Sequence, residues 1–144
     1  MANRYRCVWG LVVMVGGGLL GAALGAQAPT STAAGVFTAD QAKRGQSVYA
    51  DACAKCHLDD LSGGATSPPL KGSDFLSGWT GKSVGALLDE IKMTMPFDSP
   101  GSLTGAQYAD VLAYILSAND FPAGAMELGQ DSGALQQVKI EKSH

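Results

Sequence analysis

The stretch CAKCH, from Cys53 to His57, constrains this chain more than any other part of the sequence. Two cysteines three positions apart, with a histidine directly after the second, fit three kinds of site: a redox dithiol, one half of a zinc site, or a haem attachment site. Each kind needs different residues elsewhere in the chain, so the rest of the sequence has to be compared with all three.

The first 26 residues have the pattern of a secretory signal. Arg4 and Arg6 precede a run without charge, CVWGLVVMVGGGLLGAALGA, which ends in small residues. This pattern predicts a signal peptide, residues 1–26, cleaved near Gly25 or Ala26, and therefore a periplasmic protein. The run is also long enough to span a bilayer as an uncleaved anchor, although six of its residues are glycine.

Removal of this segment leaves a short acidic chain. Cys7 leaves with it, so the mature protein has two cysteines, Cys53 and Cys56. Lys+Arg falls from 10 to 8 against 13 Asp+Glu, which gives a net charge of −5. Such a charge argues against nucleic acid as a partner, and against a membrane unless the N-terminal segment is retained. A chain this short has a limited core, so we expect another group to help hold it together.

The two ends of the mature chain lack clear helical periodicity. Residues 27–37 are small and polar, which predicts a flexible linker. Residues 123–144 carry isolated apolar residues, which predicts a tail that lies over the surface or is partly disordered. Residues 38–122 are therefore the expected folded domain.

Three helices are predicted within this domain, and each begins at a hydroxyl residue. Thr38, Ser83 and Thr104 are the expected N-caps, because apolar residues at helical spacing follow each of them. Gln41 and Gln107 stand three residues after the two threonines, which predicts a capping box at both places. No alternating strand pattern is present in the sequence.

A long loop follows the CAKCH stretch. Residues 57–82 are dominated by Gly, Ser, Asp and Pro, with a short helical turn expected at Phe75 and Leu76. A loop of this length is uncommon in a small domain and is usually functional. Because it has little regular structure of its own, it needs something to wrap around.

Haem attachment explains these features better than the other kinds of site. A zinc site needs about four ligands, and the mature chain offers only the two cysteines, His57 and the last residue, His144. A dithiol oxidoreductase places CxxC after a strand, whereas a predicted helix precedes the motif here. A structural disulfide leaves the histidine and the loop unexplained. Haem needs two thiols about one helical turn apart and a neighbouring histidine that reaches the iron.

Over residues 38–122 the chain resembles a class I c-type cytochrome, with a helix, CxxCH, a Gly/Pro loop, a helix, a methionine loop and a last helix. The resemblance implies a small all-α fold wrapped around one covalent haem c, bound through Cys53 and Cys56, in which the haem replaces much of the core. It also implies a glycine and aromatic residues where the first and last helices cross, and the matching residues are Gly45, Tyr49, Tyr108 and Tyr114.

The second axial ligand decides the function of such an iron. A methionine opposite His57 gives a closed electron-transfer site, whereas an open side gives ligand binding or peroxide chemistry. The mature methionines are Met93, Met95 and Met126. Met95 is favoured over Met93 because the following proline pushes it out of the helix into an extended conformation. The family also places its ligand in an MP sequence.

Two further contacts are implied by the resemblance alone. In the family the ligating histidine donates its other N–H to a proline carbonyl, and SPPLKG supplies Pro68, with Pro69 as the alternative. Trp79 matches an aromatic residue near the haem propionates. It fits an ordinary core tryptophan equally well, since a buried indole N–H also seeks a partner.

These features predict an exported monohaem cytochrome that carries single electrons between redox partners, a dehydrogenase, an oxidase or both, and that is not itself an enzyme. Two alternatives stay open. The stretches MPFDSPGSL and YADVLAYILSANDFPAG resemble cytochrome subunits of quinoprotein alcohol and sugar dehydrogenases, so the chain fits a subunit of a dehydrogenase or oxidase complex. An open-site haem sensor or enzyme is the other, although no distal histidine is available for it.

Overall fold

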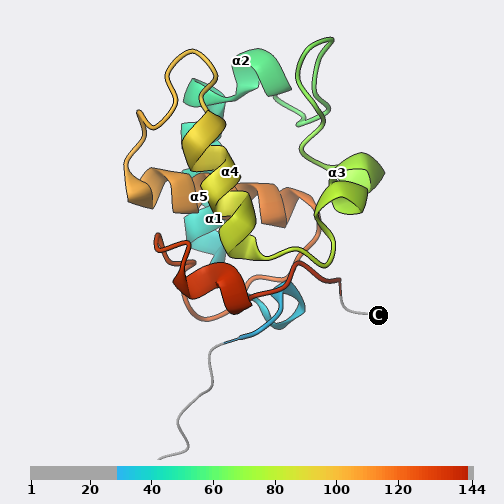
Figure 1. The fold of residues 1–144 in the computed structure, drawn as a ribbon, viewed down its shortest axis with the longest axis vertical. Coiled ribbons are helices and arrows are strands. Elements are labelled where there is room, and N and C mark those ends of the chain that lie inside the picture. The colour runs from blue at the N-terminus through green and yellow to red at the C-terminus, as the bar shows by residue number, and fades with distance from the viewer. Residues whose placement is uncertain (1–28, 143–144) are drawn as a thin grey trace, which may run out of the picture.

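The computed structural model describes residues 29–142, and the predicted signal peptide lies outside the described residues. Within them the fold is all-α, as predicted, and two isolated bridges are its only β pairing (Figure 1). The elements, in chain order, are η1 (Thr32–Ala34), α1 (Ala39–Ala52), α2 (Ala54–His57), α3 (Gly72–Trp79), α4 (Val84–Thr94), α5 (Gly105–Ala118) and η2 (Ala134–Gln137).

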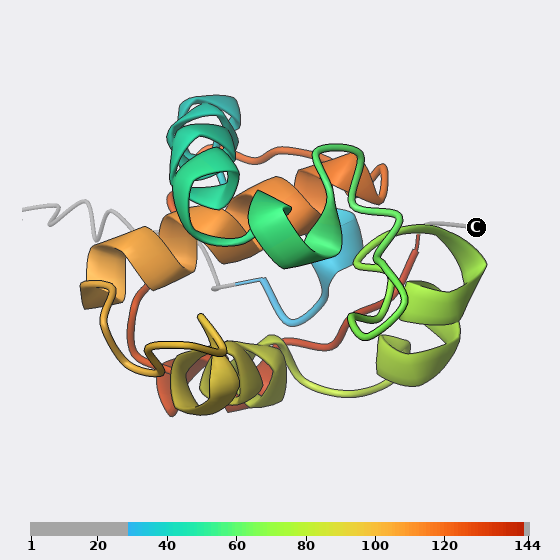
Figure 2. The same cartoon turned by 90° about the horizontal axis from the view of Figure 1, so that it is seen from above.

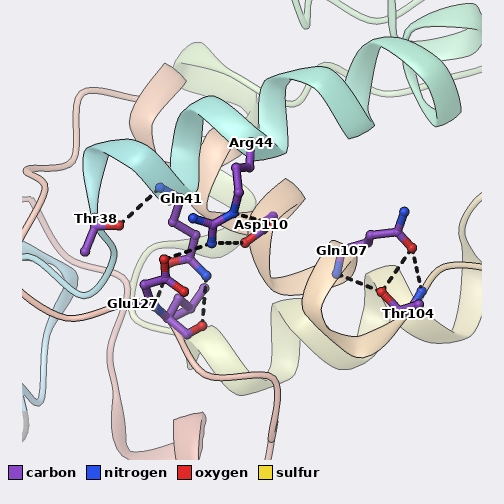
Figure 3. Close-up of polar contacts among 8 residues, drawn as sticks. Thr38, Gln41, Arg44, Thr104, Gln107, Asp110 and Glu127 are labelled. Atoms are coloured by element: carbon purple, nitrogen blue, oxygen red, sulfur yellow. Dashed lines mark hydrogen bonds and ion pairs between the residues drawn. The ribbon is translucent and has the colours of Figure 1, made fainter.

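The three predicted N-caps are confirmed. The hydroxyl oxygens of Thr38, Ser83 and Thr104 each accept a hydrogen bond from the backbone of the first turn. At Thr104 the capping box is complete, because the side chain of Gln107 also bonds back to the cap (Figure 3). The side chain of Gln41 behaves differently: it is buried and pairs with both backbone groups of Leu128 in the tail, at 2.9 and 2.7 Å.

Helices α1 and α5 cross in close contact, as the resemblance implied (Figure 2). Gly45 lies at the crossing, where a Cβ atom would come within 1.8 Å of the carbonyl oxygen of Asp110. A glycine is therefore needed for this approach of the two backbones. One turn further on, the rings of Tyr49 and Tyr114 pack with their centroids 5.2 Å apart.

The prediction of a flexible linker before α1 is wrong for residues 31–37. Val36 and Phe37 are buried in the core, and Thr32 is fully buried. The backbone N–H of Thr32 donates to Lys139 over 2.8 Å, and Lys139 returns a bond to Thr30 over 2.8 Å. The segment is thus held by a short pairing with the C-terminal residues.

The prediction of a surface-lying or partly disordered tail is also wrong for residues 123–142. Leu128, Val138 and Ile140 are buried, and the tail binds the start of α4 through the bond from Val84 N–H to Val138 at 2.9 Å. Helix η2 packs against α4 at Gly85, and the two lie side by side in Figure 1. The tail therefore fixes α4 on the side opposite the cavity described below.

Candidate haem site

A cavity of about 410 Å³ lies between α2, α3, α4 and α5. This volume is in the range of small-molecule and cofactor sites. The six residues predicted for the site all line it: Cys53, Cys56, His57, Pro68, Trp79 and Met95. They come from positions up to 42 apart in the chain, so the fold brings together residues that the sequence could only associate by motif.

The imidazole of His57 is buried and held by one hydrogen bond. Its Nδ1 lies 2.9 Å from the carbonyl oxygen of Pro68. Because a carbonyl oxygen only accepts, Nδ1 carries the proton and Nε2 is left with its lone pair free for a metal. The partner is Pro68 and not Pro69.

The two cysteines of the motif lie on either side of the start of α2. Cys53 is its N-cap residue, and the backbone N–H of Cys56 bonds to the Cys53 carbonyl over 3.1 Å, which sets the thiols about one helical turn apart. Both are free, Cys53 half-buried and Cys56 exposed. Burial raises the pKa of the Cys53 thiol to about 11. Within residues 29–142 no cluster of three or more His, Cys, Asp and Glu side chains suits a metal ion.

Of the three methionines among the described residues, Met95 lines the cavity. Its backbone is extended, at φ −127° and ψ 151°, as expected for a residue before proline, and it forms the C-cap of α4. Met93 is 67% exposed and Met126 is 60% exposed, and neither lines the cavity. Among these three methionines, Met95 is therefore the one that lies at the cavity.

The rest of the lining is mostly apolar. Aliphatic and aromatic side chains come from α3, α4, α5 and the loop before α3: Leu70, Phe75, Leu87, Ile91, Val111 and Ile115. Lys55, Glu90 and Asp98 are the charged residues of the lining. Trp79 lines the cavity from the end of α3, and the ammonium of Lys82 lies 4.8 Å from the centroid of its ring.

Three residues near the site were not identified from the sequence. Phe97 lines the cavity although it is 83% exposed, so it lies at the boundary between cavity and solvent. The sequence did not single out Asn119 for the site, and it predicted Tyr108 only as an aromatic residue where the first and last helices cross. Both hold backbone carbonyls of residues in the lining, Leu70 and Met95. Their spacing in the sequence carries no signal for these contacts, which join segments far apart in the chain.

Fold and cavity define a class: a small all-α cytochrome c domain with a CxxCH motif beside an apolar cavity. Residues 40–115 match the family described as "Cytochrome C oxidase, cbb3-type, subunit III", and the chain belongs to this family. The residues present fit covalently bound haem c, with Cys53 and Cys56 as the attachment residues. This cofactor supplies reversible one-electron chemistry at iron, so haem-based electron transfer is the chemistry of the domain.

Two known proteins are similar to parts of the chain. A thiosulfate dehydrogenase of Stutzerimonas stutzeri (strain A1501) is 36% identical over 80 residues, which is 51% of this chain and 26% of that protein. The chain thus spans about a quarter of the length of this relative. The sulfane dehydrogenase SoxCD of Paracoccus pantotrophus is 21% identical and shares the fold over 75% of this chain and 62% of that one, with a TM-score of 0.50. Among residues 29–142, no helix has the length and apolar character needed to cross a membrane.

Proposed function

We propose that this protein is an exported, periplasmic carrier of single electrons, in which His57 and Met95 are the two axial ligands of the haem iron. One observation carries the proposal: His57, with its Nδ1 bonded to Pro68, and Met95 line the same apolar cavity. The exposure of Met93 supports the choice of Met95. With both axial positions filled by protein, no position remains for a substrate, and the chain acts as a carrier and not as an enzyme.

The surroundings of the two side chains support this role. The hydrogen bond to Pro68 fixes the ring of His57 and makes its free nitrogen a better donor to a metal. A neutral thioether favours ferrous iron, and apolar walls disfavour the additional charge of the ferric state, so both raise the reduction potential. Trp79 lines the cavity, with the Lys82 ammonium 4.8 Å from the centroid of its ring, and its indole N–H is the group we expect to donate to a haem propionate.

The partners follow from the same proposal. The carrier receives electrons from a dehydrogenase and delivers them to an oxidase or another acceptor protein. The similarity to part of a thiosulfate dehydrogenase favours a second arrangement, in which the chain is the electron-transfer subunit of a dehydrogenase complex. Candidate donors are thiosulfate-oxidising and quinoprotein alcohol or sugar dehydrogenases. Copurification from the native host separates a free carrier from a subunit.

The axial ligands are tested by comparing two neighbouring methionines in holoprotein matured with covalent haem. Met95→Ala removes the long-wavelength sulfur-to-iron charge-transfer band of the ferric protein, lowers the reduction potential and opens the ferrous iron to carbon monoxide. Met93→Ala, the matched control, keeps the band. If the two variants behave the other way round, Met93 is the ligand. If neither changes the spectrum, the closed-site proposal fails and an open-site sensor or enzyme replaces it.

Attachment and export are tested on the same preparation. Acidified acetone leaves the haem on the wild-type protein, and Cys53→Ala with Cys56→Ala abolishes attachment. The mass of the mature protein isolated from the periplasm reports the cleavage position, expected near residue 26. A protein that retains residues 1–26 and sediments with membranes would show an anchored carrier in place of a free one.

A further inference from the structure

Tyr108 makes one contact with the segment that contains the proposed methionine ligand. It lies in the first turn of α5, is 2% exposed, and its hydroxyl donates a hydrogen bond to the backbone carbonyl oxygen of Met95 over 2.8 Å. This bond spans the gap between the end of α4 and the start of α5. It acts on the backbone of Met95 and leaves the thioether free.

The segment that begins at Met95 has few other polar contacts. We call residues 95–103 the methionine loop. The amide of Met95 bonds back to Ile91 in α4, and the loop contains two turn bonds, from Ser99 to Pro96 and from Ser102 to Ser99. In the part of the chain that the structure describes, the bond from Tyr108 is the only hydrogen bond that joins this loop to an element other than α4.

We propose that Tyr108 is a positioning residue for the axial methionine: its hydroxyl holds the Met95 backbone so that the thioether stays at the cavity. This inference rests on the proposed function, because it needs Met95 as ligand. Without the hydroxyl, the half-buried carbonyl loses its partner and the loop is joined to the rest of the fold mainly by the packing of Leu103. The open form of the loop, in which the sixth position is free, then becomes more populated.

Tyr49 provides a matched control. It is also 2% exposed, and its hydroxyl also donates to a backbone carbonyl, that of Leu58, over 2.7 Å. That carbonyl belongs to the residue after His57, on the other side of the site. Phenylalanine at either position removes one oxygen atom and keeps the ring, so both variants lose one buried hydrogen bond of the same kind.

The test is a titration of the ferric holoprotein with imidazole, which binds the iron only when the methionine is displaced. The apparent dissociation constant depends on the fraction of open loop. Tyr108→Phe lowers the apparent dissociation constant for imidazole roughly 2- to 10-fold, the range expected when the closed form loses one hydrogen bond. Tyr49→Phe leaves the apparent dissociation constant unchanged, although both variants lower the unfolding midpoint in urea by a similar amount.

A double-variant cycle with Met95→Ala identifies the route of the effect. In the Met95→Ala background no methionine has to be displaced, so adding Tyr108→Phe leaves imidazole affinity unchanged. The inference is overturned if Tyr108→Phe lowers the apparent dissociation constant by the same factor in both backgrounds, or if Tyr49→Phe lowers it by that factor too. Either result would show a general loosening of the fold. If Tyr108→Phe does not lower the apparent dissociation constant while Met95→Ala behaves as a ligand variant, the inference about Tyr108 fails and the proposed ligation by Met95 stands. If Met95→Ala itself binds imidazole no more tightly than wild type, the proposed ligation has failed instead.

Discussion

The loops that carry the two proposed ligands are held in different ways. We call residues 58–71, which follow His57, the histidine loop. Its carbonyls accept bonds from α1, from the C-cap residue of α5 and from the histidine itself: Leu58 from Tyr49, Leu70 from Asn119, and Pro68 from His57. It also has internal bonds, such as that from Leu70 N–H to Leu61 over 2.9 Å. Among the described residues, the methionine loop has one hydrogen bond to an element other than α4, the bond from Tyr108.

The difference indicates that one side of the site is fixed and the other can open. Leu58 and Leu61 of the histidine loop have positive φ angles of 63° and 61°. Such conformations are unfavourable for residues with a Cβ and persist where surrounding contacts enforce them. The methionine loop has no comparable set of tertiary bonds among the described residues. We therefore expect exchange of ligands to occur on the methionine side.

The largest effect is expected when the haem is absent. The protein made without haem attachment keeps an apolar cavity and loses the ligand that stabilises only the native state. Its thermal unfolding, followed by circular dichroism, is broad and weakly cooperative. Hydrogen exchange separates the two loops: Met95, Ser99 and Ser102 lose protection, whereas Gly63 and Leu70 retain more of it.

Amides of the α1–α5 crossing serve as the internal reference for that experiment, since their contacts do not involve the cavity. A sharp thermal transition equal to that of the holoprotein would contradict the prediction. Equal loss of protection in both loops would remove the comparison between them.

An intermediate effect is expected from Asn119→Ala, which acts on the histidine loop. The buried amide of Asn119 donates to Leu70 and Ile115 over 2.9 and 2.8 Å and accepts from Gly72 over 2.9 Å. Its removal leaves buried backbone groups without partners and lowers the free energy of unfolding by about 2 kcal/mol. Urea unfolding measures this loss, and imidazole affinity stays at the wild-type value because the methionine loop is untouched.

The neighbouring residue Asp120 provides the control for Asn119. Its side chain is exposed, and its one ion pair among the described residues is a 4.0 Å contact with Lys142, so Asp120→Asn changes stability little. A strong change of imidazole affinity in Asn119→Ala would show that the two loops are coupled and would contradict a fixed histidine loop beside a methionine loop that opens independently.

The smallest effect is expected away from both loops, where α1, α5 and the tail meet. Arg44 donates to both carboxylate oxygens of Asp110, at 3.0 and 3.1 Å. Its guanidinium also pairs with one carboxylate oxygen of Glu127, at 2.9 Å (Figure 3). The hydrogen bond to Asp110, and after it the one to Glu127, raise the pKa of Arg44 above its usual range. Glu127→Gln removes the more exposed of the two ion pairs. It lowers the free energy of unfolding slightly at low salt and less at high salt. Urea unfolding at two ionic strengths checks this, and a change in the sulfur-to-iron band would contradict it.

Local features of the sequence determined much of the site. The spacing of Cys53, Cys56 and His57 defines the attachment motif, and hydroxyl caps define where the helices begin, because both depend on residues within one helical turn. Pro96 directly after Met95 predicted the extended backbone that is present at this residue. The resemblance to a known family added Pro68, whose carbonyl does accept the bond from His57.

The tertiary structure decided what depends on segments that meet only after folding. The tail has isolated apolar residues and no periodicity, yet Leu128 pairs with Gln41, 87 positions away, and Ile140 is fully buried. The contact of Tyr108 with Met95 likewise joins a side chain in one helix to a backbone carbonyl at the end of another. A backbone carbonyl is common to every residue, so the sequence holds no sign of which one a buried tyrosine will find. Only the packing of α4 against α5, fixed by the tail, brings these two groups together.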